Sequence, residues 1–300
     1  MTWRLASKLT IDNHANGALQ SVAASVMWGA TGVWIVQLAM PVREVLLYRF
    51  ALSLLVVCAV MRLSARARLA RTIADKNDLA GGVALFFYYA LSTAAFSLAN
   101  MVSVSLIVAT TPAFVMGALW MRGKRPARAA VIGALLAFGG VAVLLAPAGF
   151  SPGGGEYLGE ALALGSVLSM TAFSLLGRAP DSHAAGASLW ACFIGASALS
   201  LVAIGSGAPP VVPDAEQWLL LLGLAAFSTV AAAACYGNAC RLCGATTAAV
   251  VRLSTPLFAA LFLVAVFGQG LSARHFIAGG LILLGAGVVI VRRTAPSTGD

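Results

Sequence analysis

The feature that most constrains this chain is a succession of long apolar runs separated by short polar gaps. A helix that crosses the hydrocarbon core of a bilayer needs about 20 mostly apolar residues. Ten segments meet this condition, at approximately residues 18–38, 45–61, 79–97, 101–120, 129–146, 157–176, 185–204, 217–236, 246–267 and 275–291. The sequence therefore predicts an all-α integral membrane protein with ten transmembrane helices.

The composition excludes an ordinary soluble domain. Hydrophobic residues make up 60% of the chain and charged residues 10%, with a mean hydropathy of +0.93, whereas soluble domains carry about 25% charged residues. The net charge of +9 does not indicate nucleic-acid binding, because the basic residues lie in short gaps and not on one continuous face. The first run is longer than the core of a secretory signal. We therefore expect a retained first span and a lipid bilayer as the partner.

The basic residues are distributed unequally between the two sides of the predicted membrane. Of the 19 lysine and arginine residues, 15 fall on the side that holds both termini and two, Arg43 and Arg274, on the other. The remaining two, Arg49 and Arg252, lie inside spans. Because lysine and arginine are enriched in cytoplasmic loops, this asymmetry predicts that both termini are cytoplasmic.

A Pro- and Gly-rich stretch at residues 146–155 separates the spans into two groups of five. The halves resemble each other, since Thr-Pro-Ala-Phe at 111–114 and Thr-Pro-Leu-Phe at 255–258 each precede a Gly-rich span. Five is odd, so the second half must enter the membrane from the opposite side, and the predicted repeats are inverted. The predicted parts are a tail (1–17), the first repeat (18–146), a linker (147–156), the second repeat (157–292) and a second tail (293–300).

Several short motifs resemble those of one transporter superfamily. They are Trp28-Gly29, Pro41 followed by Arg49-Phe50, Thr111-Pro112, Ser254-Thr255-Pro256, and the glycines of the fifth and tenth spans. Together they are similar to the drug/metabolite transporter superfamily, its EamA-type branch of ten-span permeases, and within that branch the YddG-type exporters of aromatic and other amino acids. The resemblance implies a transporter of the bacterial inner membrane.

The chain departs from this family at one repeated position. Family members often carry a Gly-Glu pair after the fourth and ninth spans, whereas this chain has Gly123-Lys124-Arg125 and Gly268-Gln269 there.

The ionisable residues argue against an enzyme and against an internal proton relay. All ten acidic residues and all three histidines lie in predicted loops or at span ends, and only Glu160 falls about one turn inside a span. Pumps use buried Asp, Glu or His, so we expect a facilitator or exchanger. A Walker-type loop and a set of Ser, His and Asp that could converge are both absent from the sequence. No catalytic residue and no cofactor are expected.

The cysteines favour helix packing over metal binding. They are odd in number and lie in or beside apolar runs, at Cys58, Cys192, Cys235, Cys240 and Cys243. The last three lack a nearby fourth ligand such as His. No metal site is predicted.

Aromatic and polar residues inside the spans are the candidates for contact with a substrate. Trp28, near the centre of the first span, either forms a stacking wall of a cavity or packs between helices. In the third span Tyr89, Ser92, Phe96 and Asn100 recur at steps of three and four, on one helical face. Such polar groups lack partners in hydrocarbon, so this face lines a cavity or supplies polar packing.

Charged and amide groups near the other spans add further candidates. Arg252 lies about two turns inside the ninth span, where a buried cation costs at least about 2.5 kcal/mol; it either binds a substrate carboxylate or a cluster of backbone carbonyls. Arg49, near the outer end of the second span, is expected to snorkel or to pair with Glu44. Tyr236 and Asn238, near the end of the eighth span, are weaker candidates for lining the cavity.

Prolines and small residues point to hinges and tight packing. Pro112 and Pro256 occupy matching places in two spans, where they act as gating hinges or as packing kinks. Gly133 with Ala137, and a pair of glycines at 280 and 285, allow close approach of helices in the fifth and tenth spans. Those two spans are expected to be scaffold or the surface of a homodimer.

These observations predict a secondary transporter that exports, facilitates or exchanges small organic solutes by alternating access. Amino acids, including aromatic ones, and related metabolites are the expected substrates. An alternative keeps the fold and carries nucleotide-sugars, sugar phosphates or lipid carriers. Another is a membrane scaffold or lipid-handling protein that transports nothing.

Overall fold

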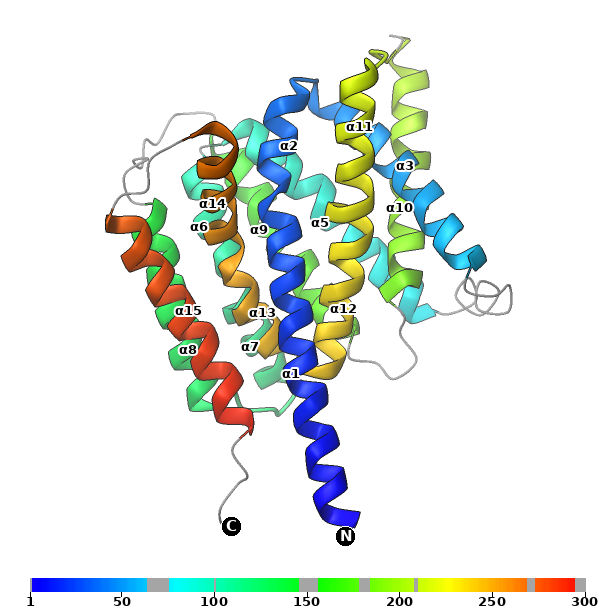
Figure 1. Ribbon diagram of the computed structural model, residues 1–300. Coiled ribbons are helices and arrows are strands. Elements are labelled where there is room, and N and C mark those ends of the chain that lie inside the picture. The colour runs from blue at the N-terminus through cyan, green and yellow to red at the C-terminus, as the bar shows by residue number, and fades with distance from the viewer. Residues whose placement is uncertain are drawn as a thin grey trace.

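The computed structural model describes residues 2–63, 76–99, 101–145, 156–177, 184–207, 210–268 and 273–294. These residues are almost wholly helical, and no strand occurs among them. The helices run side by side as a bundle, with the start of the first helix and the end of the last at the same end of it (Figure 1). Within these described ranges, seven helical stretches are long and apolar enough to cross a membrane, and two shorter apolar helices accompany them.

The helices of the described part of the chain fall into ten consecutive segments, five in each half. The first half comprises α1 (Thr2–Gly29) with α2 (Thr31–Leu38), α3 (Val42–Leu63), α5 (Lys76–Leu98), α6 (Met101–Ala109) with α7 (Thr111–Met121), and α8 (Arg128–Leu145). The second comprises α9 (Glu156–Leu176), α10 (Ala184–Gly205), α11 (Ala215–Gly223) with η2 (Leu224–Ala231) and α12 (Ala232–Leu242), α13 (Ala245–Val251) with η3 (Arg252–Ser254) and α14 (Thr255–Phe267), and α15 (Ala273–Thr294). The predicted fold class is confirmed.

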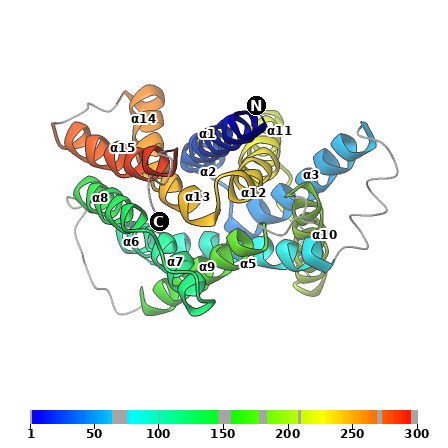
Figure 2. The ribbon, with the colours of Figure 1, turned by 90° about the horizontal axis from the view of Figure 1, so that it is seen from below.

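The packing of the helices has the symmetry of an inverted repeat. The third segment of the first half, α5, packs along the first of the second half, α9, and conversely α12 packs along α1. The second segments, α3 and α10, contact each other, as do the fifth, α8 and α15. Figure 2 shows the α8–α15 and α5–α9 pairs side by side. Each half therefore buries its apolar faces largely against the other half.

The fifth and tenth segments are held together by their small residues. A Cβ atom added at Gly285 would lie 2.7 Å from the backbone nitrogen of Ala137, and one added at Gly133 would clash with the carbonyl of Gly285. Only small residues permit so close an approach of two backbones. Gly280, expected at such a contact, instead faces open space.

The fourth and ninth segments are interrupted just before their prolines. The hydroxyls of Thr110 and Thr111 donate to the carbonyls of Ile107 and Val108, each at 2.6 Å. In the other half, Ser254 and Thr255 donate to the carbonyls three residues before them, each at 2.8 Å. Because proline cannot donate to the preceding turn, these hydroxyls replace the lost hydrogen bonds. The helix is thus interrupted just before Pro112 and Pro256, and the hinge role of the two prolines stays a prediction.

The eighth segment contains a π-helical stretch, η2, in its middle. A side chain makes the same five-residue step, since the hydroxyl of Thr229 donates to the carbonyl of Leu224 at 3.2 Å. Short π segments occur frequently at functional sites. This stretch faces α3 and α1 and contributes to the site described next.

Candidate functional site

A cluster of aromatic rings and one arginine lies where the two halves meet. This central cluster consists of Trp28 on α1, Tyr88 and Tyr89 on α5, Tyr236 on α12 and Arg252 on η3, all buried. The Trp28 ring lies 5.4 Å from that of Tyr236 and 6.2 Å from that of Tyr88, and the two α5 tyrosines are 5.1 Å apart. Substrate sites of inverted-repeat transporters lie at this kind of interface.

Arg252 is surrounded by hydroxyls and ring faces. Its Nη1 donates to the Tyr88 hydroxyl at 3.3 Å, and its Nη2 to the Thr111 hydroxyl at 3.0 Å. The guanidinium carbon lies 5.5 Å from the centre of the Trp28 ring and 5.8 Å from that of Tyr236. These groups are neutral, so they solvate the guanidinium without cancelling its charge. An anionic group of a substrate would complete the arrangement.

Trp28 and Tyr89 connect α1 and α5 to the π-helical stretch. The Trp28 Nε1 donates to the carbonyl of Ser228 at 3.0 Å, and the Tyr89 hydroxyl donates to the same carbonyl at 3.1 Å. Both side chains therefore have partners for their polar atoms although they are far from water. Contacts of this kind tie the first half of the chain to the eighth segment at the level of the central cluster.

Arg49 also reaches this region, contrary to the sequence-based expectation. It is only 2% exposed, its Nε donates to the Thr229 hydroxyl at 2.6 Å, and its guanidinium carbon lies 4.3 Å from the centre of the Tyr89 ring. Glu44 pairs instead with Arg43, at 2.6 Å. The prediction of a snorkelling or Glu44-paired arginine was wrong. Residues three or four apart share a helical face, and Glu44 and Arg49 are five apart.

The other predicted residues of α5 do not share the environment of Tyr89. Ser92 is partly buried and donates to the backbone carbonyl of Tyr89 at 3.3 Å. Phe96 is 46% exposed and lies outside the central cluster, while Asn100 lies outside the described residues. A shared helical face does not ensure a shared environment, because the neighbouring helices change along the length of α5.

Tyr236 and Asn238 lie in two different environments. The Tyr236 hydroxyl lies 2.9 Å from the hydroxyl of Ser174, and its ring stacks on Phe173 at 6.3 Å, so it closes one side of the central cluster. Asn238 is partly buried and accepts a hydrogen bond from Arg241 at 3.3 Å. Being two residues further along α12, it faces a different space.

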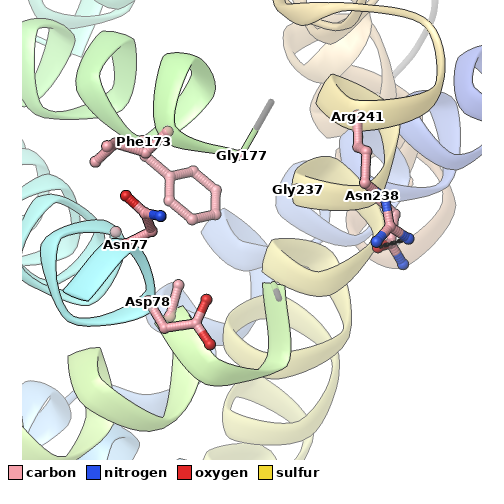
Figure 3. A pocket seen from close by; sticks show the side chains of 10 residues that line it. Asn77, Asp78, Phe173, Gly177, Gly237, Asn238 and Arg241 are labelled. Atoms are coloured by element: carbon pink, nitrogen blue, oxygen red, sulfur yellow. Dashed lines mark hydrogen bonds between the residues drawn. The ribbon is translucent and has the colours of Figure 1, made fainter. Parts of the chain in front are cut away.

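That space is a narrow cleft at the end of the bundle where α5 begins and α9 and α12 end. It is lined by Asn77, Asp78, Gly81, Phe173, Leu176, Gly177, Ala187, Gly237, Asn238 and Arg241. Figure 3 shows Asn77 and Asp78 beside Phe173, with Asn238 and Arg241 across from them on α12. Phe173 lines the cleft and also stacks on Tyr236, so its ring lies between the cleft and the central cluster.

The sequence-based search missed three neighbours of the predicted residues. Tyr88 and Thr111 bind Arg252 directly, and Ser228 accepts from Trp28 and Tyr89. Thr111 stands out in the sequence only as part of the repeated Thr-Pro motif. Tyr88 is next to Tyr89 in the sequence, and two adjacent phenols inside an apolar run could have indicated that Tyr88 also belongs to the site.

The fold and the site together define a class: an integral membrane protein of two inverted five-helix repeats with polar and aromatic groups gathered between them, as in many secondary transporters. The family model described as "EamA-like transporter family" matches residues 15–146 and again residues 157–291. The chain therefore belongs to the EamA-like transporter family, whose members are membrane transporters of small solutes and not enzymes.

One solved structure, titled "Crystal structure of protein", has the same fold. It is 20% identical in sequence, superposes with a TM-score of 0.78, and the match covers 94% of this chain and 100% of that one. At this identity the likeness concerns the fold alone. The comparison with curated proteins gives no match.

Proposed function

We propose that this protein is a secondary transporter that moves amino acids, aromatic ones included, across the bacterial inner membrane, with both termini in the cytoplasm. The observation that carries the proposal is the guanidinium of Arg252, placed among the rings of Trp28, Tyr88 and Tyr236 at the interface of the repeats. A guanidinium holds a carboxylate through two parallel hydrogen bonds. The rings supply an apolar wall, and near the cation they interact favourably with it.

Alternating access would be produced by movement of the two halves around this site. The central cluster is buried in the present conformation, and opening of the cleft at the end of α12, which Phe173 separates from the cluster, would give access to it from one side. The interruptions at Pro112 and Pro256 adjoin the cluster, because Thr111 binds Arg252 across the repeat interface. A bend at either proline would therefore change the distance between the arginine and its partners.

The expected transport is facilitated diffusion or exchange. The central cluster contains no acidic side chain, and the buried carboxylates of the described residues, Glu44 and Asp78, both lie in the first turn of a helix. Proton-coupled carriers commonly use acidic residues inside the membrane. The cluster offers arginine and hydroxyl groups, which bind a cargo without taking up a proton at neutral pH.

One observation favours a second cargo, sugar phosphates or nucleotide-sugars. Phosphate groups are bound by several basic residues in concert, and the structure brings Arg49 as well as Arg252 into the interior of the bundle.

The test is an uptake measurement in proteoliposomes with radiolabelled amino acids and sugar phosphates, without an imposed pH gradient. Aromatic amino acids should enter down their concentration gradients, and Trp28→Ala should lower the initial rate roughly tenfold, because the loss of a buried ring contact costs about 1–2 kcal/mol. Trp120→Ala is the matched control, since that ring is 64% exposed, and its rate should be unchanged.

Two outcomes would contradict the proposal. One is uptake of sugar phosphates with no uptake of any amino acid. The other is accumulation that occurs only when a proton gradient is imposed and that is lost in Glu160→Gln, which would show coupling to a carboxylate. Failure to move any solute would favour the non-transporting scaffold.

A further inference from the structure

Among the described residues, two arginines are buried in the membrane part of the bundle, and neither is paired with a described acidic side chain. Arg49 is 2% exposed and Arg252 is 7% exposed. In the described part of the chain, the one ion pair joins Arg43 to Glu44 near the start of α3. All hydrogen bonds that the two guanidiniums make run to neutral hydroxyls. The interior therefore carries two positive charges with no fixed negative charge beside them.

The two guanidiniums lie on either side of a pair of adjacent tyrosines. Arg49 stacks on the Tyr89 ring at 4.3 Å, Tyr89 lies 5.1 Å from Tyr88, and Arg252 lies 5.8 Å from the Tyr88 ring. Trp28 connects the same two regions, since its ring lies 5.5 Å from Arg252 and its Nε1 donates to Ser228, whose hydroxyl accepts from Arg49 at 3.2 Å. Both cations thus flank the same aromatic cluster, at two different positions.

A purely structural role explains this arrangement poorly. A buried cation is costly, and neutral hydrogen bonds compensate it less well than a carboxylate does. If Arg49 served only to tie α3 to the eighth segment, a neutral side chain would do so without leaving an uncompensated charge in the membrane. An anion that reaches this cluster would supply the missing charge, and its oxygen atoms would replace the hydroxyls of Ser228 and Thr229 as partners of Arg49.

We propose that Arg49 is a second anion-binding group of the central cluster, so that the favoured cargo is an organic anion with two carboxylates, one held at Arg252 and one at Arg49. This rests on the proposed function only in taking the central cluster as the cargo site. An acidic amino acid or a simple dicarboxylate meets the requirement. A zwitterion with one carboxylate occupies only one of the two positions.

The experiment measures binding to the purified protein in detergent by calorimetry, so that it does not depend on transport. The probes are glutarate and its half-amide glutaramate, which have the same length and differ by one charge, together with succinate and adipate to vary the spacing. The best diacid should bind roughly tenfold or more tightly than its half-amide, because a hydrogen-bonded charged pair contributes more than a neutral one. Arg49→Gln should reduce this ratio to about one, whereas Arg252→Gln should weaken both probes.

The matched control is Arg62→Gln, at the exposed far end of the same helix, which should keep the full preference. If Arg49→Gln does not fold, Thr229→Val removes a neutral partner of Arg49 and leaves the charge in place; the preference should then persist or increase. The proposal is overturned if the wild-type protein does not prefer the diacid at any chain length, or if Arg49→Gln retains the preference. Amino-acid transport decides the proposed function separately, and either result can stand without the other.

Discussion

At the scale of single residues, each guanidinium of the interior exchanges water for neutral oxygen atoms and aromatic rings when the chain folds. Transfer of a cation to the bilayer centre costs at least about 2.5 kcal/mol, and the partners found around Arg252 offset part of this cost. All of them come from other helices: Tyr88 lies on α5 and Thr111 on α7. Because these partners are neutral, an anionic cargo is expected to be able to replace them at the guanidinium.

Substitution of Arg252 tests this at the same scale. Arg252→Gln should lower transport roughly tenfold or more, the effect of losing a hydrogen bond to a charged group. Arg252→Lys should restore little, because an ammonium lacks the planar fork that binds a carboxylate bidentately. The measurement is initial uptake by each variant, normalised to folded protein and accompanied by its melting temperature. Wild-type rates in both folded variants would rule out Arg252 as a carboxylate ligand.

The residues of the site were foreseen in part. Depth within an apolar run pointed to Trp28 and Arg252, and polarity inside a span pointed to Tyr89 and Tyr236. The structure gathers these four side chains in the central cluster, and their contact with a substrate stays a prediction. The environments of Arg49 and Phe96 were not foreseeable, because each depends on which helix lies opposite. The bonds of Arg49 to the eighth segment, for example, join residues about 180 positions apart.

At the scale of helices, two kinds of segment can be distinguished: those whose helix is interrupted and those that are regular and tightly packed. Those that surround the central cluster include a π-helical stretch and two breaks before proline. The pair α8 and α15 is uninterrupted and joined through small residues. Irregular backbone in a membrane requires local hydrogen-bond partners, and the hydroxyls at Thr110, Thr111, Ser254 and Thr255 supply them. The moving parts are therefore expected among the interrupted segments.

The α8–α15 pair gives a prediction at this scale. Gly285→Leu should destabilise the protein by about 1–3 kcal/mol or more, because a side chain there collides with the backbone of Ala137 and Gly133 and the helices must separate. Gly280→Leu, on the same helix but with nothing near its added Cβ atom, should change the stability little. Thermal unfolding of both variants in one detergent makes the comparison. Equal melting temperatures would mean that the close approach contributes nothing.

At the scale of the whole molecule, the inverted repeat explains why the site lies between the halves. Each half places its third segment against the first segment of the other, so α5 meets α9 and α12 meets α1. The central cluster draws its side chains from α1, α5, α12 and η3, two elements from each half. A movement that exchanges the conformations of the halves would expose this region to the two sides in turn.

Topology is the prediction that belongs to this scale. Reporter fusions after Pro147, in the segment between the halves, and after Arg293 should give opposite signals, with alkaline phosphatase active at the first and a cytoplasmic fluorescent protein bright at the second. The reason is the excess of basic residues on the side of the termini. Matching responses at the two positions would contradict five spans in each half.

The sequence by itself determined the fold class, the number of segments and the relation of the halves. These follow from local properties: the length of an apolar run against the thickness of a bilayer, the odd number of spans in each half, and a repeated Thr-Pro pair. Only the tertiary structure decided which of the polar residues meet. Hydrogen bonds within the central cluster join residues 61 and 164 positions apart, and helix periodicity defines a face without defining what covers it. Both Arg49 and Phe96 therefore differ from expectation. Arg49 is buried against the π-helical stretch, and Phe96 is exposed on the outside of the bundle.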